Sequence, residues 1–328
     1  MVAAHLFAAT GPCSAGCAAG RIPPLAGLTV AVVIYALGGG LLEVLVSPIA
    51  EACPTRRKSA MMGLLHSFYC WGSVATIALS TLFFFCFGTQ NWRILAMLWA
   101  LLPLVNALVF TQVPLAPLTP EGEKGLPLGQ LFRTPRFWLF LLLMACAGAS
   151  ELSISQWASA FAESALGVSK TVGDLAGPLA FALLMGLSRL VYAAYSRTHP
   201  SPVGFMTAST ALCIAGYLLV SLSPWPALAL AGCALCGMAV GCMWPGTFSL
   251  AAACFPRSGT ALFALLALAG DLGCSAGPGL VGLVSSAWGD RLQYGLLAAV
   301  IFPLLLLAGL ALLRKQLSRK ISTLFVSL

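Results

Sequence analysis

Two glutamates interrupt long apolar stretches of the sequence, and both could do acid–base chemistry inside a membrane. Glu43 stands in GGGLLEVLVSP and Glu151 in ACAGASELSIS. An ionised side chain at membrane depth costs roughly 2.5–3.5 kcal/mol on insertion scales, so it tends to face a protein interior or a water-filled path. A carboxyl group in such a site can exchange a proton near neutral pH. We expect both acids to bind protons; the alternative for Glu43 is a protonated acid bonded to neighbouring backbone.

Polar and aromatic residues follow Glu151 closely. Ser155 lies one helical turn further on, and Gln156 and Trp157 come directly after it. Residues four apart share a helix face, so Glu151 and Ser155 are expected to line a cavity together. A carboxylate near an aromatic ring suits a sugar, with hydrogen bonds to hydroxyls and apolar contact to the ring face. The alternative for Trp157 is anchoring at the outer membrane interface, where tryptophan is enriched.

A histidine and an arginine are further candidates. His66 lies about two turns after the basic turn at 56–58. Histidine titrates near neutral pH, so His66 could share a proton with Glu43; the alternative is a histidine packed and hydrogen-bonded among helices. Arg189 lies toward the cytoplasmic end of its apolar stretch. It acts either as a gate or partner for an acid, or extends its charged head to the inner interface.

Two candidates have an equally good packing interpretation. Asp271 stands near the middle of an apolar stretch among glycines at 270, 273 and 277. It either lines a cavity or satisfies a neighbouring helix, since glycines allow close helix packing. Trp244, beside Pro245, is either a cavity aromatic or a packing residue.

Other kinds of chemistry are not indicated. The G-K-[ST] pattern of a phosphate-binding loop does not occur, which argues against an ATP-driven pump. A membrane-embedded enzyme would need clustered ligands or bases at one depth, but the histidines stand at 5, 66 and 199. Cys233 and Cys236 form a C-x-x-C without a second ligand pair, which favours small residues packing between helices. We expect no enzyme activity, no metal and no cofactor.

The elements that would position these residues are membrane-spanning helices. Hydrophobic residues make up 60% of the chain, charged residues 8%, and mean hydropathy is +0.96. Because about a quarter of a soluble domain is charged, this composition predicts an all-α, polytopic membrane protein. Apolar runs long enough to cross a bilayer lie at 27–50, 60–86, 92–112, 135–161, 172–195, 203–222, 226–253, 259–286 and 291–313. Residues 2–19 resemble a partial tenth span.

Basic residues indicate the orientation. If the turn at 56–58 is cytoplasmic, alternating the spans places twelve Lys and Arg residues inside and four outside, as the positive-inside rule requires. The C-terminus is then cytoplasmic. We expect a multi-pass protein of the inner or plasma membrane whose partners are the lipid bilayer, a small solute and protons. Nucleic acid is not expected, because the basic residues lie in short loops.

The chain is predicted to form two bundles. The longest polar interruption, with four prolines and mixed charge, lies at 111–133. It separates a partial bundle at 1–112 from a six-helix bundle at 134–328, with the cytoplasmic linker at 113–133. GGLLEVLVSPIAEACPTRRKSAMM is also faintly repeated 202 residues later by GCMWPGTFSLAAACFPRSGTALF. Two halves of like topology are typical of transporters built from parallel repeats.

Several of these segments resemble a known family. GGGLLEVLVSPIAEACP followed by MMGLLHSFYCWGSV is similar to the fourth and fifth helices of sugar permeases of the major facilitator superfamily, in the fucose-permease-like branch of proton symporters. GASELSISQWASAF resembles the family's seventh helix, and MGLSRL its eighth. The sequence departs from the pattern at Ser47, usually Asn, and at His66, usually Gln. Family members have twelve helices, and this sequence begins at about the third, so we expect an N-terminally truncated chain.

The resemblance implies a function. It implies a monomer with two bundles around a central cavity, which transports a sugar or related metabolite with protons by alternating access. Glu43 would be the acid of the fourth helix that faces this cavity. Two alternatives stay open within this class: an efflux carrier for hydrophobic compounds, and a truncated transporter without activity.

Overall fold

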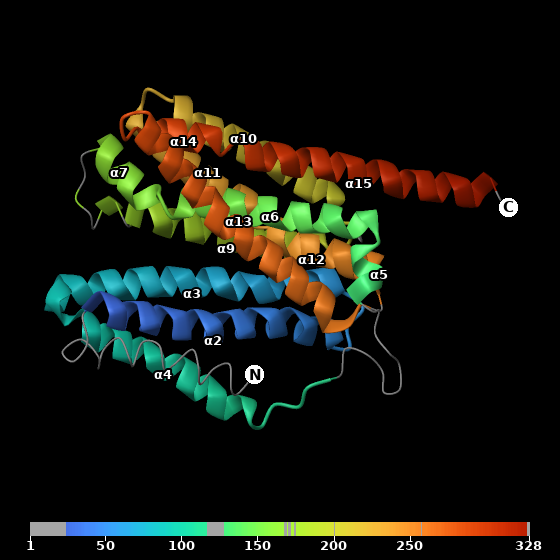
Figure 1. Cartoon of the computed structure of the whole chain (residues 1–328), viewed down its shortest axis with the longest axis horizontal. Coiled ribbons are helices and arrows are strands. Elements are labelled where there is room, and N and C mark those ends of the chain that lie inside the picture. The colour runs from blue at the N-terminus through green and yellow to red at the C-terminus, as the bar shows by residue number, and fades with distance from the viewer. Residues whose placement is uncertain are drawn as a thin grey trace. The chain divides into compact units, whose positions relative to one another are not determined.

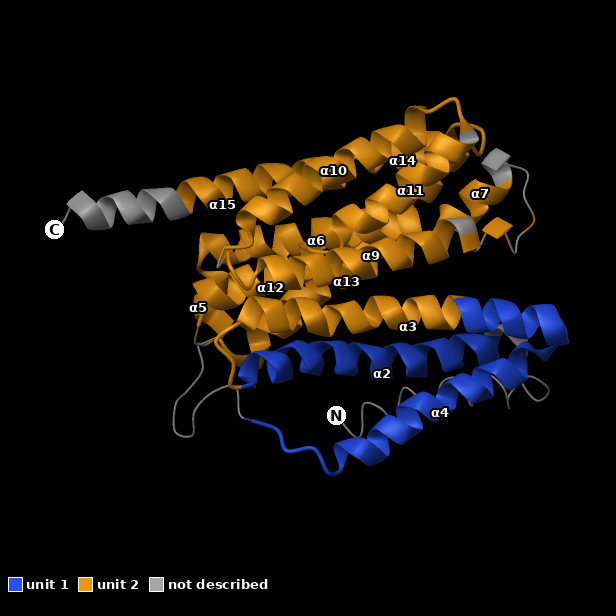
Figure 2. Ribbon diagram, turned by 180° about the vertical axis from the view of Figure 1, so that it is seen from behind, with its two compact units in different colours: residues 1–53, 78–122 blue, residues 54–77, 123–328 orange. Residues whose placement is uncertain are grey.

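A computed structural model describes residues 24–116, 128–166, 169, 172–173, 175–199, 201–256 and 258–326, and every regular element in these ranges is helical (Figure 1). The chain forms two compact units (Figure 2). Unit 1 comprises residues 1–53 and 78–122, and unit 2 comprises residues 54–77 and 123–328. The bundle boundaries predicted from the sequence, at 112 and 134, stay a prediction. The partial span predicted at 2–19 lies outside the described residues.

Unit 1 holds long apolar helices. Its elements are α2 (Pro24–Ala52), the last third of α3 (Lys58–Phe87), the 3-10 turn η1 (Thr89–Asn91) and α4 (Trp92–Phe110). Gly88 has a positive φ of 77°, a conformation that glycine adopts without steric cost, where the chain leaves α3. Each of α2 and α4 carries an internal proline, Pro48 and Pro103.

Unit 2 holds the first two thirds of α3, up to residue 77, and the described helices from α5 onward. These are α5 (Leu128–Phe132), α6 (Pro135–Ser155), α7 (Ala158–Leu166), the π-helical turn η2 (Leu175–Leu179), α9 (Ala180–Tyr195), α10 (Val203–Leu222), α11 (Pro226–Val240), α12 (Met243–Cys254), α13 (Gly259–Ala287), α14 (Leu292–Ala298) and α15 (Ile301–Val326). Helices α6 and α11 both begin at proline, whose missing N–H would have no partner in a first helical turn. The most extensive contact joins α6 to α13, and α10 packs against α11.

Nine helices in the described residues are long and apolar enough to cross a membrane. They lie at Ala26–Ala52, Lys58–Phe87, Thr89–Phe110, Pro135–Glu163, Gly177–Tyr195, Val203–Leu222, Ala227–Cys254, Gly259–Ala287 and Leu292–Gln316. The nine predicted spans correspond to these in order, and the all-α membrane fold is confirmed. The largest difference is the fifth span, predicted from 172 and found from Gly177, because the turn η2 with Pro178 precedes α9.

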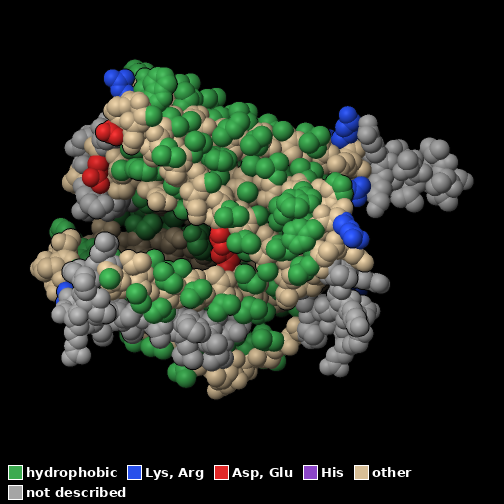
Figure 3. All heavy atoms as spheres, in the orientation of Figure 1, with side chains coloured by type: hydrophobic (Ala, Val, Ile, Leu, Met, Phe, Trp, Pro, Cys, Tyr) green, Lys and Arg blue, Asp and Glu red, His purple; other side chains and the backbone are tan. Residues whose placement is uncertain are grey.

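The outer surface suits a lipid environment. Hydrophobic side chains cover the flanks of the helices, and Lys and Arg gather near helix ends (Figure 3). Leu283 is 75% exposed and Leu222 is 62% exposed, which water would oppose and hydrocarbon favours. At one end of unit 2, Arg136 Nε donates to Gln316 Oε1 at 3.3 Å, so the basic residues at 133, 136, 314 and 315 share that end.

Small residues let α6 and α13 approach until their backbones touch. A Cβ added to Gly273 would collide with the carbonyl oxygen of Ala145, and one added to Gly277 would lie 2.6 Å from that of Ala149. A main-chain oxygen in a helix cannot move aside as a flexible side chain can. Helix association in a membrane depends on van der Waals packing of this kind. The pair α6–α13 is therefore a tightly packed part of unit 2.

This contact generates a stability prediction. Gly273→Ala should lower the melting temperature of the purified protein in detergent by about 5 °C or more, because overpacking costs roughly 1–3 kcal/mol. Gly279→Ala is the matched control: it makes the same change on α13, where an added Cβ meets nothing within 4 Å. The measurement is a thermal melt followed by intrinsic fluorescence. Equal melting temperatures for the two variants would contradict the close packing.

Candidate functional site

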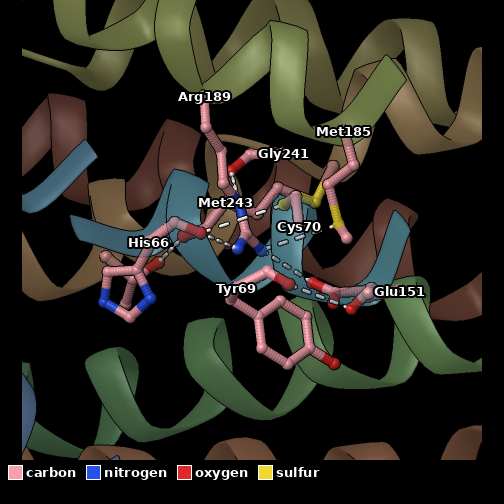
Figure 4. Close-up of polar contacts among 10 residues, drawn as sticks. His66, Tyr69, Cys70, Glu151, Met185, Arg189, Gly241 and Met243 are labelled. Carbon is pink, nitrogen blue, oxygen red and sulfur yellow. Dashed lines mark hydrogen bonds and ion pairs between the residues drawn. The ribbon is translucent and has the colours of Figure 1, made fainter. Parts of the chain in front are cut away.

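Arg189 occupies the interior of unit 2. It lies on α9, its side chain is almost fully buried, and the residue is 2% exposed. Its Nε donates to the carbonyl oxygen of Gly241 at 3.0 Å, and its Nη1 donates to that of His66 at 2.6 Å. Gly241 lies at the break between α11 and α12, and His66 lies in α3 (Figure 4). One guanidinium group thus joins three separate segments of the chain.

The charge of Arg189 is matched by Glu151. Arg189 Nη2 lies 3.4 Å from Glu151 Oε2, and Glu151, on α6, is 6% exposed. The same Nη2 lies 3.6 Å from Met185 Sδ, one turn earlier on α9. Figure 4 shows the two charged groups turned toward each other across the space between their helices. This is an ion pair in the membrane-spanning part of the protein.

Burial makes the two partners depend on each other. Bringing charges out of water is costly, and removing one partner of a buried pair costs about 3–5 kcal/mol because the other charge stays uncompensated. The planar guanidinium can bond a carboxylate and main-chain carbonyls at once, which lysine cannot do in the same geometry. Protonation of the Glu151 carboxylate would leave the Arg189 charge without its counter-ion, so the two groups are energetically linked.

Tyr69 is a member of the site that the sequence did not reveal. The guanidinium carbon of Arg189 lies 5.5 Å from the centre of the Tyr69 ring, within range of a cation–π interaction. Tyr69 is on α3, one turn after His66, and is 58% exposed. It therefore covers the arginine with one side of its ring and presents the rest of its side chain outward. Met185 and the carbonyl of Gly241 were also missed, because only the fold brings them to Arg189.

His66 meets the pair through its main chain. Its carbonyl accepts from Arg189, whereas its ring stacks on Phe248 with centroids 5.7 Å apart. Figure 4 shows the imidazole turned away from the guanidinium. The proton sharing with Glu43 that the sequence suggested stays a prediction.

The residues after Glu151 divide between two environments. Ser155 is the last residue of α6, and the turn Gln156–Trp157 separates it from α7. Gln156 is exposed. Trp157 Nε1 donates to the carbonyl oxygen of Pro278 at 3.2 Å, and its ring packs near Gly282 of α13. This hydrogen bond therefore joins the break between α6 and α7, within the span Pro135–Glu163, to α13.

Trp244, on α12, is buried, whereas Asp271, on α13, is exposed. Trp244 is 7% exposed, and its ring lies against Gly270 and edge-on to Phe248, with centroids 6.2 Å apart. These contacts agree with packing, and a role of Trp244 in the cavity stays a prediction. Asp271 lies on the exposed side of α13, near the middle of its span, and Ser275 Oγ donates to its main-chain carbonyl at 3.1 Å.

Glu43 belongs to unit 1. It lies on α2, five residues before Pro48, and is partly exposed, while Ser47 is buried. Proline has no N–H to give, so the carbonyl of Val44 lacks its helical partner within a turn of this acid. The structure thus brings Glu151, Arg189 and the His66 backbone together in unit 2 and keeps Glu43 in the other unit.

Comparison with known proteins assigns the chain to a family. Residues 1–278 match the model of the Major Facilitator Superfamily. A search of curated proteins found no match.

Solved structures share the fold. The fucose:proton symporter of Escherichia coli superposes with a TM-score of 0.76 at 14% identity, over 95% of this chain and 82% of that one. A proton:xylose symporter superposes with a TM-score of 0.77 at 13% identity, over 96% of this chain and 78% of that one. The human organic anion transporter MFSD10 superposes with a TM-score of 0.73 at 17% identity, over 94% of this chain and 76% of that one. At these identities the likeness shows the fold alone. The family model covers most of the sequence, and the chain belongs to the Major Facilitator Superfamily, a family of membrane transporters.

Proposed function

We propose that this protein is a secondary transporter of a small polar solute, a sugar or related metabolite, which it moves with protons by alternating access. The observation that carries the proposal is the buried ion pair between Glu151 and Arg189, 3.4 Å apart in the membrane-spanning part of unit 2. Ionisable residues at this depth mark solute paths and proton relays in membrane proteins. The named symporters of fucose and xylose support the solute class, since both share the fold.

Protonation of Glu151 would change which arrangement of unit 2 is favoured. With Glu151 ionised, Arg189 has its counter-ion and both charges are compensated. With Glu151 protonated, the arginine charge is uncompensated at that position, and an arrangement that gives it another partner becomes favourable. A proton can shift a conformational equilibrium only through such a difference between states. The pair therefore supplies a physical means of coupling.

Further residues are proposed to contact the solute. Tyr69 is 58% exposed beside the ion pair, and its ring and hydroxyl suit the apolar face and the hydroxyls of a sugar. Ser155, Gln156 and Asp271 are less buried than Glu151 and offer further hydrogen-bonding groups. Trp157 and Trp244 are proposed to support the site through their contacts with α13. Glu43 is proposed as the second proton- or hydroxyl-binding acid.

Glu151→Gln should lower proton-driven accumulation of solute at least about tenfold, because the amide cannot be ionised and so cannot exchange the coupling proton. Vesicles containing the purified protein would be screened with labelled sugars under an imposed pH gradient. Exchange of labelled for unlabelled solute across the membrane needs no net proton movement, and it should persist. Glu163→Gln is the matched control, since Glu163 lies on α7 bonded to Ser159.

The double variant Glu151→Gln/Arg189→Gln separates loss of folding from loss of coupling. It removes both charges together, so no uncompensated charge stays buried to destabilise the fold. Full accumulation by a well-folded Glu151→Gln protein would contradict the role of the pair. Expulsion of hydrophobic dyes without uptake of any sugar would overturn the proposed solute class.

Glu43→Gln tests the other acid. We expect uptake to fall at least about tenfold, because the acid interrupts an apolar span and such residues serve solute or proton paths. Glu51→Gln on the same helix is the control. Initial uptake rates at several solute concentrations would be measured for both variants. If the Glu43 variant transports as well as the native protein, that acid is structural.

A further inference from the structure

Arg189 is hydrogen-bonded to a break in a membrane-spanning helix. The span Ala227–Cys254 is divided into α11, which ends at Val240, and α12, which begins at Met243. In a continuous helix the carbonyl of Gly241 would accept from the N–H four residues later, but that residue is Pro245. The ladder resumes one step on, where Gly246 N–H donates to Cys242 O at 2.9 Å. Proline therefore removes the helical donor of one carbonyl, that of Gly241.

Arg189 supplies the missing donor. Its Nε lies 3.0 Å from Gly241 O. The approach depends on glycine: a Cβ at position 241 would lie 2.8 Å from the carbonyl oxygen of Met185 and 2.8 Å from the Cβ of Ser188, both on α9. A buried carbonyl without a partner costs about 1–3 kcal/mol, so the bond is strongly favoured. Gly241 and Pro245 together make a receptor for an arginine side chain from α9.

The bond at Nε orients the rest of the guanidinium. The group is planar, so fixing Nε and its direction also fixes where Nη1 and Nη2 point. In this structure they point at His66 O and Glu151 Oε2. We propose that Pro245 is a positioning residue for the ion pair: by leaving the Gly241 carbonyl to Arg189, it holds the guanidinium beside Glu151. The role in transport rests on the proposed function, whereas the positioning itself does not.

Pro245→Ala tests this directly. The variant restores an N–H that draws the Gly241 carbonyl along the helix axis and away from Arg189. Glu151 then loses part of its fixed counter-ion and is protonated more often. Dicyclohexylcarbodiimide reacts with protonated carboxyl groups in apolar surroundings, so its attachment to the Glu151 peptide, quantified by mass spectrometry at pH 7, reports this. Labelling should rise by about threefold or more, the size of a modest coupling between contacting residues.

Two comparisons separate positioning from a general effect of removing proline. Pro103→Ala makes the same chemical change inside α4 and should leave labelling of Glu151 unchanged. Arg189→Lys keeps the charge but has no guanidinium to orient. If Pro245 acts through Arg189, adding Pro245→Ala to Arg189→Lys should produce no further increase, whereas independent structural effects would add.

The outcomes are distinct from those that test transport. Unchanged labelling in folded Pro245→Ala protein, or full additivity with Arg189→Lys, would overturn the positioning role even if Glu151→Gln abolishes proton-driven uptake. Increased and non-additive labelling would support it even if Glu151→Gln transports normally, in which case the proposed function alone fails. Where both hold, Pro245→Ala should also shift the pH dependence of uptake.

Discussion

The guanidinium of Arg189 has to be compensated in a place where water cannot do it, and much of unit 2 is arranged around that requirement. A buried charge is tolerated only if it is paired and its N–H groups are bonded. Glu151 supplies the opposite charge, and the carbonyls of His66 and Gly241 supply acceptors. These partners come from α6, α3 and the α11–α12 break, so a single side chain relates segments that are distant in sequence. Displacing any of them changes the energy of the charge at the centre.

Breaks in two membrane-spanning helices allow hydrogen bonds that a continuous helix would not make. Main-chain polar groups inside a membrane protein must be bonded, and non-helical backbone is tolerated only where protein or a cavity satisfies it. At the α11–α12 break, Pro245 frees the carbonyl of Gly241 and Arg189 bonds it. At the end of α6, Trp157 crosses to the carbonyl of Pro278. Each interruption is thus joined to a neighbouring helix by one polar side chain, which makes the interruptions parts of the packing.

The membrane spans could be predicted from the sequence, but the contact partners of the buried side chains could not. Nine helices could be predicted because apolar length is a local property, and Glu151 could be singled out because a charge in such a run is costly. Two interpretations had been left open for Arg189 and for Trp244, because each depends on which helix lies opposite. The structure shows an acid opposite Arg189 and a glycine against Trp244. Tyr69 carried no signal of its own, whereas Pro245, four residues after Gly241, is a signal that could have indicated a carbonyl without its helical donor.

The ion pair joins two closely packed helices through the long side chain of Arg189, and this bears on any change that would follow protonation of Glu151. Glu151 sits on α6, whose backbone touches that of α13 through Gly273 and Gly277, so a shift of α6 would require two backbones to separate. Helix α9 is also closely packed, since a Cβ on Gly241 would lie 2.8 Å from Met185 O, but Arg189 reaches its partners through a long side chain. Under the proposed function, neutralising Glu151 would act first on the arginine and, through its hydrogen bond to Gly241, on the α11–α12 break. Under the proposed function, α6 and α13 serve as the fixed frame and the break in α11–α12 as the element that responds.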